Sequence, residues 1–159
     1  MANITLITVG TLKEEYLKSA VDEYKKRLSQ YARVDEVNIK EERISNEDDR
    51  TEIARALAAE GEKILAAVPK GATKIALCVE GRHYSSEQLA EMVGKCCDET
   101  GKIALIIGSS HGLADAVKLS SDARISLSAL TFPHQLARVI LYEALYRSFT
   151  ILAGKKYHK

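Results

Sequence analysis

The chain has 159 residues, and 23 Lys and Arg side chains balance 22 Asp and Glu, for a formal net charge of +1. This length fits one domain, residues 1–159, with a substantial hydrophobic core. The balanced charge excludes a global field that would attract nucleic acid, so any anion-binding surface must be local. The three cysteines lack the spacing of a disulfide framework or a zinc site, and we expect no bound metal.

Targeting signals are absent from the sequence. No stretch approaches the roughly 20 apolar residues of a bilayer-spanning helix. The residues after Met1 also lack the charged start and long apolar run of a signal peptide. We therefore expect a soluble, cytoplasmic protein that does not contact a membrane.

Apolar runs alternate with amphipathic stretches along the chain. The apolar and alternating runs predict strands at Ile4–Val9, Val34–Ile39, Lys74–Val79, Ile103–Ile107 and Ala123–Ser128. The amphipathic stretches predict helices at Lys13–Tyr31, from Ser45 and Asp48 to Val68, from Ser85 to Asp98, at Leu113–Lys118 and from Pro133 to Gly154. Strands that alternate with helices indicate an α/β fold, a mainly parallel sheet with helices on both faces.

The last predicted helix is unusually apolar. Pro133 suits its first turn and Gly154 suits a left-handed C-terminal cap. Apolar residues cover well over half of its circumference, which leaves one narrow polar stripe, made of Gln135, Arg138, Tyr142 and Tyr146. Because a surface helix usually buries a single stripe, we expect this helix to have partners on two sides, the second being another subunit.

Three segments follow predicted strands and are rich in small residues. They are Glu80-Gly81, Gly108–Gly112 and Ser128–Phe132. In parallel α/β folds, ligands bind beyond the carboxyl ends of the strands. Glycines let the backbone approach a ligand, and free N–H and C=O groups can bind the edge of a purine. If the three segments converge, they form a ligand pocket.

One of these segments also matches the nucleophile elbow of serine hydrolases. Gly108-x-Ser110-x-Gly112 lies after a strand and before a helix, as that motif requires. Asp115 or Asp122 and then His134 or His158 follow in the hydrolase order. Against a small serine hydrolase, the α/β-hydrolase scaffold generally needs a larger chain, and no HGGG-type oxyanion segment is present.

The C-terminal end is locally basic. Arg138, Arg147, Lys155, Lys156 and Lys159 are accompanied by a single acidic residue, Glu143. These side chains either form an anion-binding surface or are a solvated tail that complements the helix dipole.

Several segments together resemble one family. They are Ser126–Gln135, Tyr146-Arg147, Tyr157–Lys159, Ile4–Gly10 with Lys13, Val79–Ser86 and Ile106–Leu113. With these residues the whole chain resembles the trefoil-knotted (SPOUT) methyltransferases, and among them those that modify 23S ribosomal RNA. The resemblance implies a C-terminal trefoil knot, which ordinary topology rules would have excluded.

The resemblance also implies an activity. Such enzymes use S-adenosyl-L-methionine to methylate N3 of a pseudouridine in large-subunit rRNA, act on the assembled ribosome and are homodimers. The cofactor would be bound by residues at the ends of three strands: Leu77, Glu80, Gly81, Gly108, Ser109, Gly112, Leu127, Ser128, Ala129, Leu130, Thr131 and Phe132.

Four further residues would meet the target nucleotide: Arg138, Tyr157, His158 and Lys159. Imidazole is the natural general base or proton relay near neutral pH, and a tyrosine ring can stack on a base. The tail lysines would engage RNA phosphates.

One departure from the family prompts a third hypothesis. Ser109 stands where two adjacent glycines are common, so a non-catalytic ribosome-binding module is an alternative.

Overall fold

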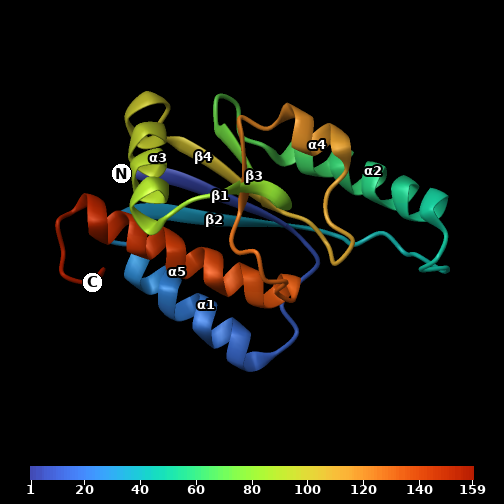
Figure 1. Cartoon of the computed structure of the whole chain (residues 1–159), viewed down its shortest axis with the longest axis horizontal. Helices are drawn as coiled ribbons and strands as arrows, with labels where there is room; N and C mark the ends of the chain where they lie inside the picture. Colours follow the sequence, from blue (N-terminus) through green and yellow to red (C-terminus); the bar gives the residue numbers. More distant parts are fainter.

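The computed structural model describes residues 1–159, and its strands form one five-stranded sheet (Figure 1). The strands are β1 (Ala2–Val9), β2 (Ala32–Ile39), β3 (Thr73–His83), β4 (Lys102–Ile107) and β5 (Ala123–Ser126). They lie in the order β2-β1-β4-β3-β5, and every neighbouring pair is parallel. The prediction of a mainly parallel sheet is confirmed.

Helices cover both faces of this sheet, as predicted. They are α1 (Glu15–Leu28), α2 (Arg50–Ala67), α3 (Ser86–Glu99), α4 (Asp115–Ser120) and α5 (His134–Leu152). The larger hydrophobic cluster lies under α1, α3 and α5, and the smaller one lies under α2 and α4 (Figure 1). A membrane-crossing helix would have to be longer or more apolar than any of these five.

Two helix starts show how local sequence sets the boundaries. Ser85 caps α3 in a capping box with Gln88, as the sequence predicted. The predicted start of α2 at Ser45 and Asp48 is wrong, because Asp49 is the cap and accepts hydrogen bonds from Thr51 and Glu52 N–H. Ser45 instead donates to the Glu52 carboxylate.

Strand β3 is longer than predicted, and Glu80-Gly81 is not a turn after it. The strand pairs with β5 up to Leu77, its register then shifts, and pairing resumes at Arg82. A Cβ on Gly81 would stand 2.4 Å from the carbonyl carbon of Ile125. A glycine is therefore required where the irregular part of β3 passes against β5.

Helix α5 packs against both α1 and α3 of its own chain. The predicted polar stripe does not face solvent, since Arg138 is 3% exposed and Tyr142 is fully buried. The Tyr142 hydroxyl donates a hydrogen bond to Glu36 on β2, whose carboxylate also pairs with Lys25 on α1. The helix ends as predicted, with Gly154 in the left-handed region at φ +63°.

Candidate active site

The carboxyl ends of β3, β4 and β5 surround a cavity of about 730 Å³. This volume is typical of a small-molecule or cofactor site. The three segments that the sequence singled out converge here, and the first turn of α5 closes one side through Pro133, His134 and Ala137. The wall of the cavity is therefore mostly apolar and carries a few polar groups.

Most of the residues predicted to bind the cofactor line this cavity. They are Leu77, Glu80, Gly108, Ser109, Gly112, Leu127, Ser128, Leu130, Thr131 and Phe132. The two that do not are Gly81, which packs against Ile125, and Ala129, which is exposed on the loop before α5.

The turn between β4 and α4 is closed by backbone contacts. The Gly112 N–H donates to the Ser109 carbonyl over 2.9 Å, and Gly112 adopts φ +88°. The Ser109 hydroxyl accepts a hydrogen bond from the His111 N–H at 3.2 Å. The serine that departs from the two-glycine pattern therefore helps to close the turn.

The loop from Ser126 to Phe132 is held by its own hydroxyl groups. The Ser126 hydroxyl donates to the Ser128 carbonyl, and the Ser128 hydroxyl accepts from the Leu130 N–H, both over 3.0 Å. Leu130 itself is 71% exposed, and Val79 on β3 is 77% exposed. Both residues line the cavity, so its wall carries two large apolar side chains that nothing in this chain covers.

Polar contacts that sequence reasoning missed also shape the cavity. Lys118 pairs with Glu80, and this hydrogen bond holds the pKa of the Glu80 carboxyl below its usual range. His111 lies 2.5 Å from the Glu47 carboxylate through Nε2, while burial lowers the pKa of His134. The pairs join residues 38 and 64 positions apart, so no local pattern pointed to them.

The geometry does not assemble a serine hydrolase. No histidine hydrogen-bonds the exposed Ser110 hydroxyl, and the adjacent His111 is engaged with Glu47 instead. Asp122 is occupied as well, since it accepts the Lys74 N–H over 2.7 Å. The structure also holds no group of three or more His, Cys, Asp or Glu side chains arranged to hold a metal ion.

Arg138 is separated from the other residues predicted to meet the nucleotide. Its Nη2 donates to the Gly10 carbonyl over 3.1 Å, its Nε has no partner, and it does not line the cavity. Burial lowers the pKa of its guanidinium. Within this chain, Arg138 braces the turn that follows β1.

The C-terminal tail is folded back along the C-terminal half of α5. The Tyr157 hydroxyl donates to Glu143 over 3.1 Å, and its ring meets the Tyr146 ring edge-on at 4.8 Å. Burial and the Glu143 carboxylate raise the pKa of Tyr157 to about 12, so its phenol is neutral near pH 7. The His158 ring lies between Arg147 and Glu87.

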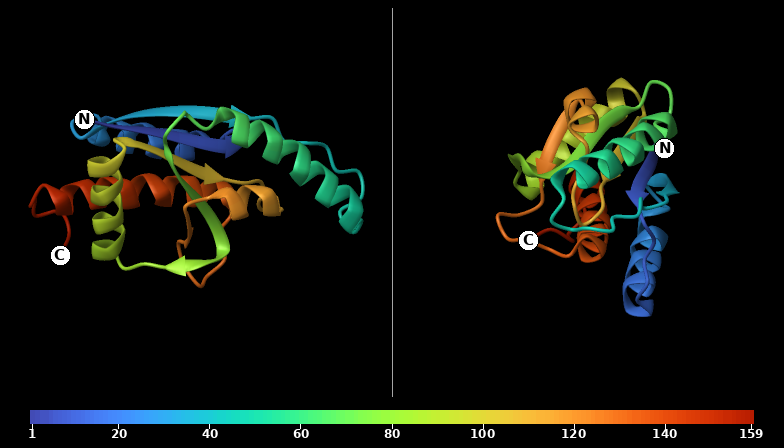
Figure 2. Two further views of the ribbon diagram at one scale, coloured as in Figure 1. Left: turned by 90° about the horizontal axis from the view of Figure 1, so that it is seen from above. Right: turned by 90° about the vertical axis from the view of Figure 1, so that its right-hand side faces the viewer.

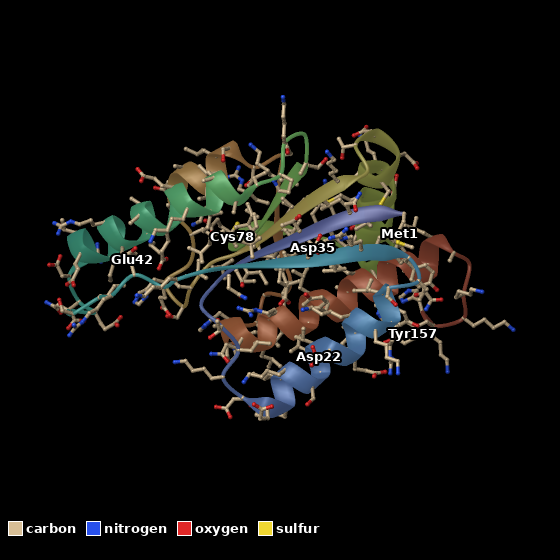
Figure 3. The ribbon with its side chains drawn as sticks, turned by 180° about the vertical axis from the view of Figure 1, so that it is seen from behind. Met1, Asp22, Asp35, Glu42, Cys78 and Tyr157 are labelled. Carbon is tan, nitrogen blue, oxygen red and sulfur yellow. The ribbon has the colours of Figure 1, made fainter.

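The tail and the cavity of one chain lie far apart. His134 lines the cavity at the first residue of α5, whereas Tyr157 follows its last residue, Leu152. Tyr157 itself turns back to Glu143, nine residues after His134, so at 1.5 Å per residue this contact lies about 14 Å along the helix from the cavity. Figure 3 shows Tyr157 at one end of α5, well away from Cys78, which lines the cavity.

Known proteins share the sequence and the fold. A family model described as a predicted SPOUT methyltransferase matches residues 2–158. A protein of Caldicellulosiruptor saccharolyticus is 44% identical over 156 residues, which is 98% of this chain and 99% of that protein. One of Clostridium novyi is 45% identical over 158 residues, 99% of each chain. Both are named ribosomal RNA large subunit methyltransferase H.

Solved structures share the fold at low sequence identity. A probable methylase family protein from Haemophilus influenzae has a TM-score of 0.57 at 17% identity, covering 98% of this chain and 70% of that one. A protein studied for 2-OH methylation of C/U34 on tRNA has a TM-score of 0.53 at 14% identity, covering 97% and 99%.

These likenesses confirm the resemblance seen in the residues, and with it the trefoil-knotted fold class and S-adenosylmethionine as the methyl donor. Because the family model spans almost the whole chain, and relatives above 40% identity cover it end to end, the protein belongs to the SPOUT methyltransferase family.

Proposed function

We propose that this protein methylates N3 of a pseudouridine in 23S ribosomal RNA, on the assembled ribosome and in the cytoplasm. The relatives that cover its full length are named as large-subunit rRNA methyltransferases. The single observation that carries the proposal is the cavity where three backbone-lined segments meet beyond the carboxyl ends of β3, β4 and β5.

The cavity fits S-adenosylmethionine in size and in chemistry. Its apolar wall, with Leu77, Ile107 and Leu127, suits a purine. The backbone of Gly108, Ser128, Leu130 and Thr131 would bind polar edges. When bound, the cofactor supplies an activated methyl group on a sulfonium. What the protein must then provide is alignment of the accepting nitrogen and removal of its proton.

We further propose a homodimer in which the tail of one copy serves the cavity of the other. The tail is held by Glu143, Arg147 and Glu87, and its contact with Glu143 lies about 14 Å along α5 from His134 in its own cavity, so the tail would have to leave these contacts to reach that cavity. The exposed Val79 and Leu130 beside the cavity offer apolar area for a second copy. A two-fold dimer would then complete two equivalent sites.

In this arrangement the tail contacts the RNA. Tyr157 would stack on the target base, and Lys155, Lys156 and Lys159, all exposed, would bind phosphates. For Arg138 we propose a supporting part, not the contact with the nucleotide that the resemblance implied. It is buried against Gly10, where it would support the wall next to Ala137.

The test is transfer of labelled methyl from S-adenosylmethionine to ribosomes, compared with ribosomes that lack the pseudouridines of the large-subunit RNA. We expect label only on particles that contain pseudouridine. Deletion of Tyr157–Lys159 should abolish transfer and preserve folding and cofactor binding. Cofactor binding without label on either particle would contradict the substrate. Ribosome binding without cofactor binding would favour the non-catalytic module.

A further inference from the structure

Glu87, the second residue of α3, contacts the C-terminal tail although 71 positions separate it from His158. Its Oε1 atom lies 2.7 Å from His158 Nε2. Figure 2 shows the tail turning back from the end of α5 toward the beginning of α3. The contact therefore ties the tail to an element that precedes it by nearly half of the chain.

The two contacts of His158 define its protonation. Arg147 Nη1 lies 3.2 Å from His158 Nδ1. A guanidinium has donors only, so Nδ1 must offer its lone pair. The proton of the neutral ring is then on Nε2, from which it is donated to Glu87. In this state neither nitrogen has a free lone pair.

The same contacts continue to Tyr157. Arg147 also pairs with Glu143, and Glu143 accepts the Tyr157 hydroxyl. The Arg147 guanidinium lies over the Tyr157 ring, 4.8 Å from its centroid. We call these five residues, Glu87, Glu143, Arg147, Tyr157 and His158, the tail clasp. It fixes both tail side chains with hydrogen bonds from two helices.

We infer that Glu87 is a positioning residue for methyl transfer, and that it holds the neutral His158 ring so that the tail is presented to the partner copy. His158 then orients Tyr157 and Lys159 and does not accept the N3 proton while the clasp is closed. This inference rests on the proposed function. The opposite hypothesis is that the tail clasp keeps the tail away from the partner's cavity. In that case loss of Glu87 would raise the rate of methyl transfer.

The location of Glu87 suits an ionised hydrogen-bond acceptor for His158. It lies in the first turn of α3, where the helix dipole favours a negative charge. A hydrogen bond from its own backbone N–H and the contact with His158 lower the pKa of its carboxyl. Glu87 is thus an ionised acceptor near pH 7, and its helix is anchored by the Ser85 capping box.

Three variants test the inference by steady-state methyl transfer to ribosomes. Glu87→Leu removes the acceptor and should lower kcat by about tenfold or more, with the KM for S-adenosylmethionine unchanged. Glu87→Gln keeps an acceptor oxygen, so its kcat should be close to that of the wild type. Glu91→Leu is the matched control, one turn along α3 and exposed, and should resemble the wild type. An unchanged or raised kcat in Glu87→Leu would overturn the inference.

A second measurement does not depend on activity. In ¹⁵N spectra of the wild-type protein, His158 should show an unprotonated Nδ1 and a protonated Nε2 near pH 7. Glu87→Leu should shift both signals toward those of a free imidazole, and Glu91→Leu should not. If wild-type protein transfers no methyl, the proposed function fails and the spectra still test the clasp. A wild-type ring with its proton on Nδ1 would contradict the clasp itself.

Discussion

A Cβ on Gly108 would stand only 2.1 Å from the carbonyl oxygen of Gly112, because the two residues meet backbone to backbone across the turn between β4 and α4. Gly108→Ala must open this turn, at a strain of about 1–3 kcal/mol. Affinity for S-adenosylmethionine should therefore fall about tenfold or more by titration calorimetry. Gly71→Ala, in the turn before β3 and outside the cavity, is the control. Equal affinity in both variants would place the cofactor elsewhere.

The buried contact between Tyr142 and Glu36 should make stability depend on high pH. Burial, followed by the Glu36 hydrogen bond, raises the pKa of Tyr142. A raised pKa means that the folded state retains the phenolic proton. The Tyr142 phenol therefore stabilises the fold fully below the pKa of tyrosine in the unfolded chain, about 10. This stabilisation is lost as the pH rises above that pKa.

Tyr142→Phe should therefore cost about 1–2 kcal/mol at pH 7 and lose less stability than wild type above pH 10. Some pH dependence should remain, because the pKa of Tyr157 is also raised. Urea unfolding at several pH values measures both effects. Tyr16→Phe alters an exposed phenol and should change neither. A parallel pH profile in Tyr142→Phe and wild type would be evidence against this contact.

A tail that acts in trans predicts complementation. One chain carries Gly108→Ala with an intact tail, and the other has an intact cavity but lacks Tyr157–Lys159. At an S-adenosylmethionine concentration far below the weakened Kd of Gly108→Ala, each homodimer should transfer little methyl. A heterodimer purified through two different tags has one complete site and should recover about half of the wild-type rate. An inactive heterodimer would indicate that the tail serves its own chain.

The lysines of the tail should contribute to RNA binding without base specificity. Lys155→Gln with Lys156→Gln should weaken ribosome binding and reduce the slope of log K against log salt by about 1 per lysine. Lys70→Gln with Lys102→Gln is a charge-matched control, since both residues lie at the amino ends of strands, at the other edge of the sheet from the cavity. Equal slopes in the two double variants would show that the tail is not a phosphate contact.

The fold was largely predictable because its signals are local. Apolar runs such as Ile103–Ile107 identify buried strands, and the Ser85 and Gln88 pair identifies the start of α3. The start of α2 was missed because Ser45, Asp48 and Asp49 are all good caps, and Glu52 selects between them by binding Ser45 itself. The irregular end of β3 was missed because its cause, contact with Ile125, is not local.

The site was predictable where the family resemblance covers it and not where tertiary contacts decide. Gly108 and Leu127 line the cavity as expected. The burial of Arg138 depends on Gly10 and Glu36, which lie more than 100 positions earlier in the chain. A polar residue on an apolar helix does not by itself reveal whether it faces solvent or a partner strand.

Helix α5 is the last element of the fold, yet it covers the same sheet face as the first helix, α1, and contacts α3 in the middle. Without residues His134–Leu152 this face is covered only by α1 and α3, so the larger core is incomplete until α5 packs between them. The cavity depends on the same helix for one of its sides. Docking of α5 therefore completes the larger core and closes the cofactor cavity together, so a change that loosens this helix should weaken both.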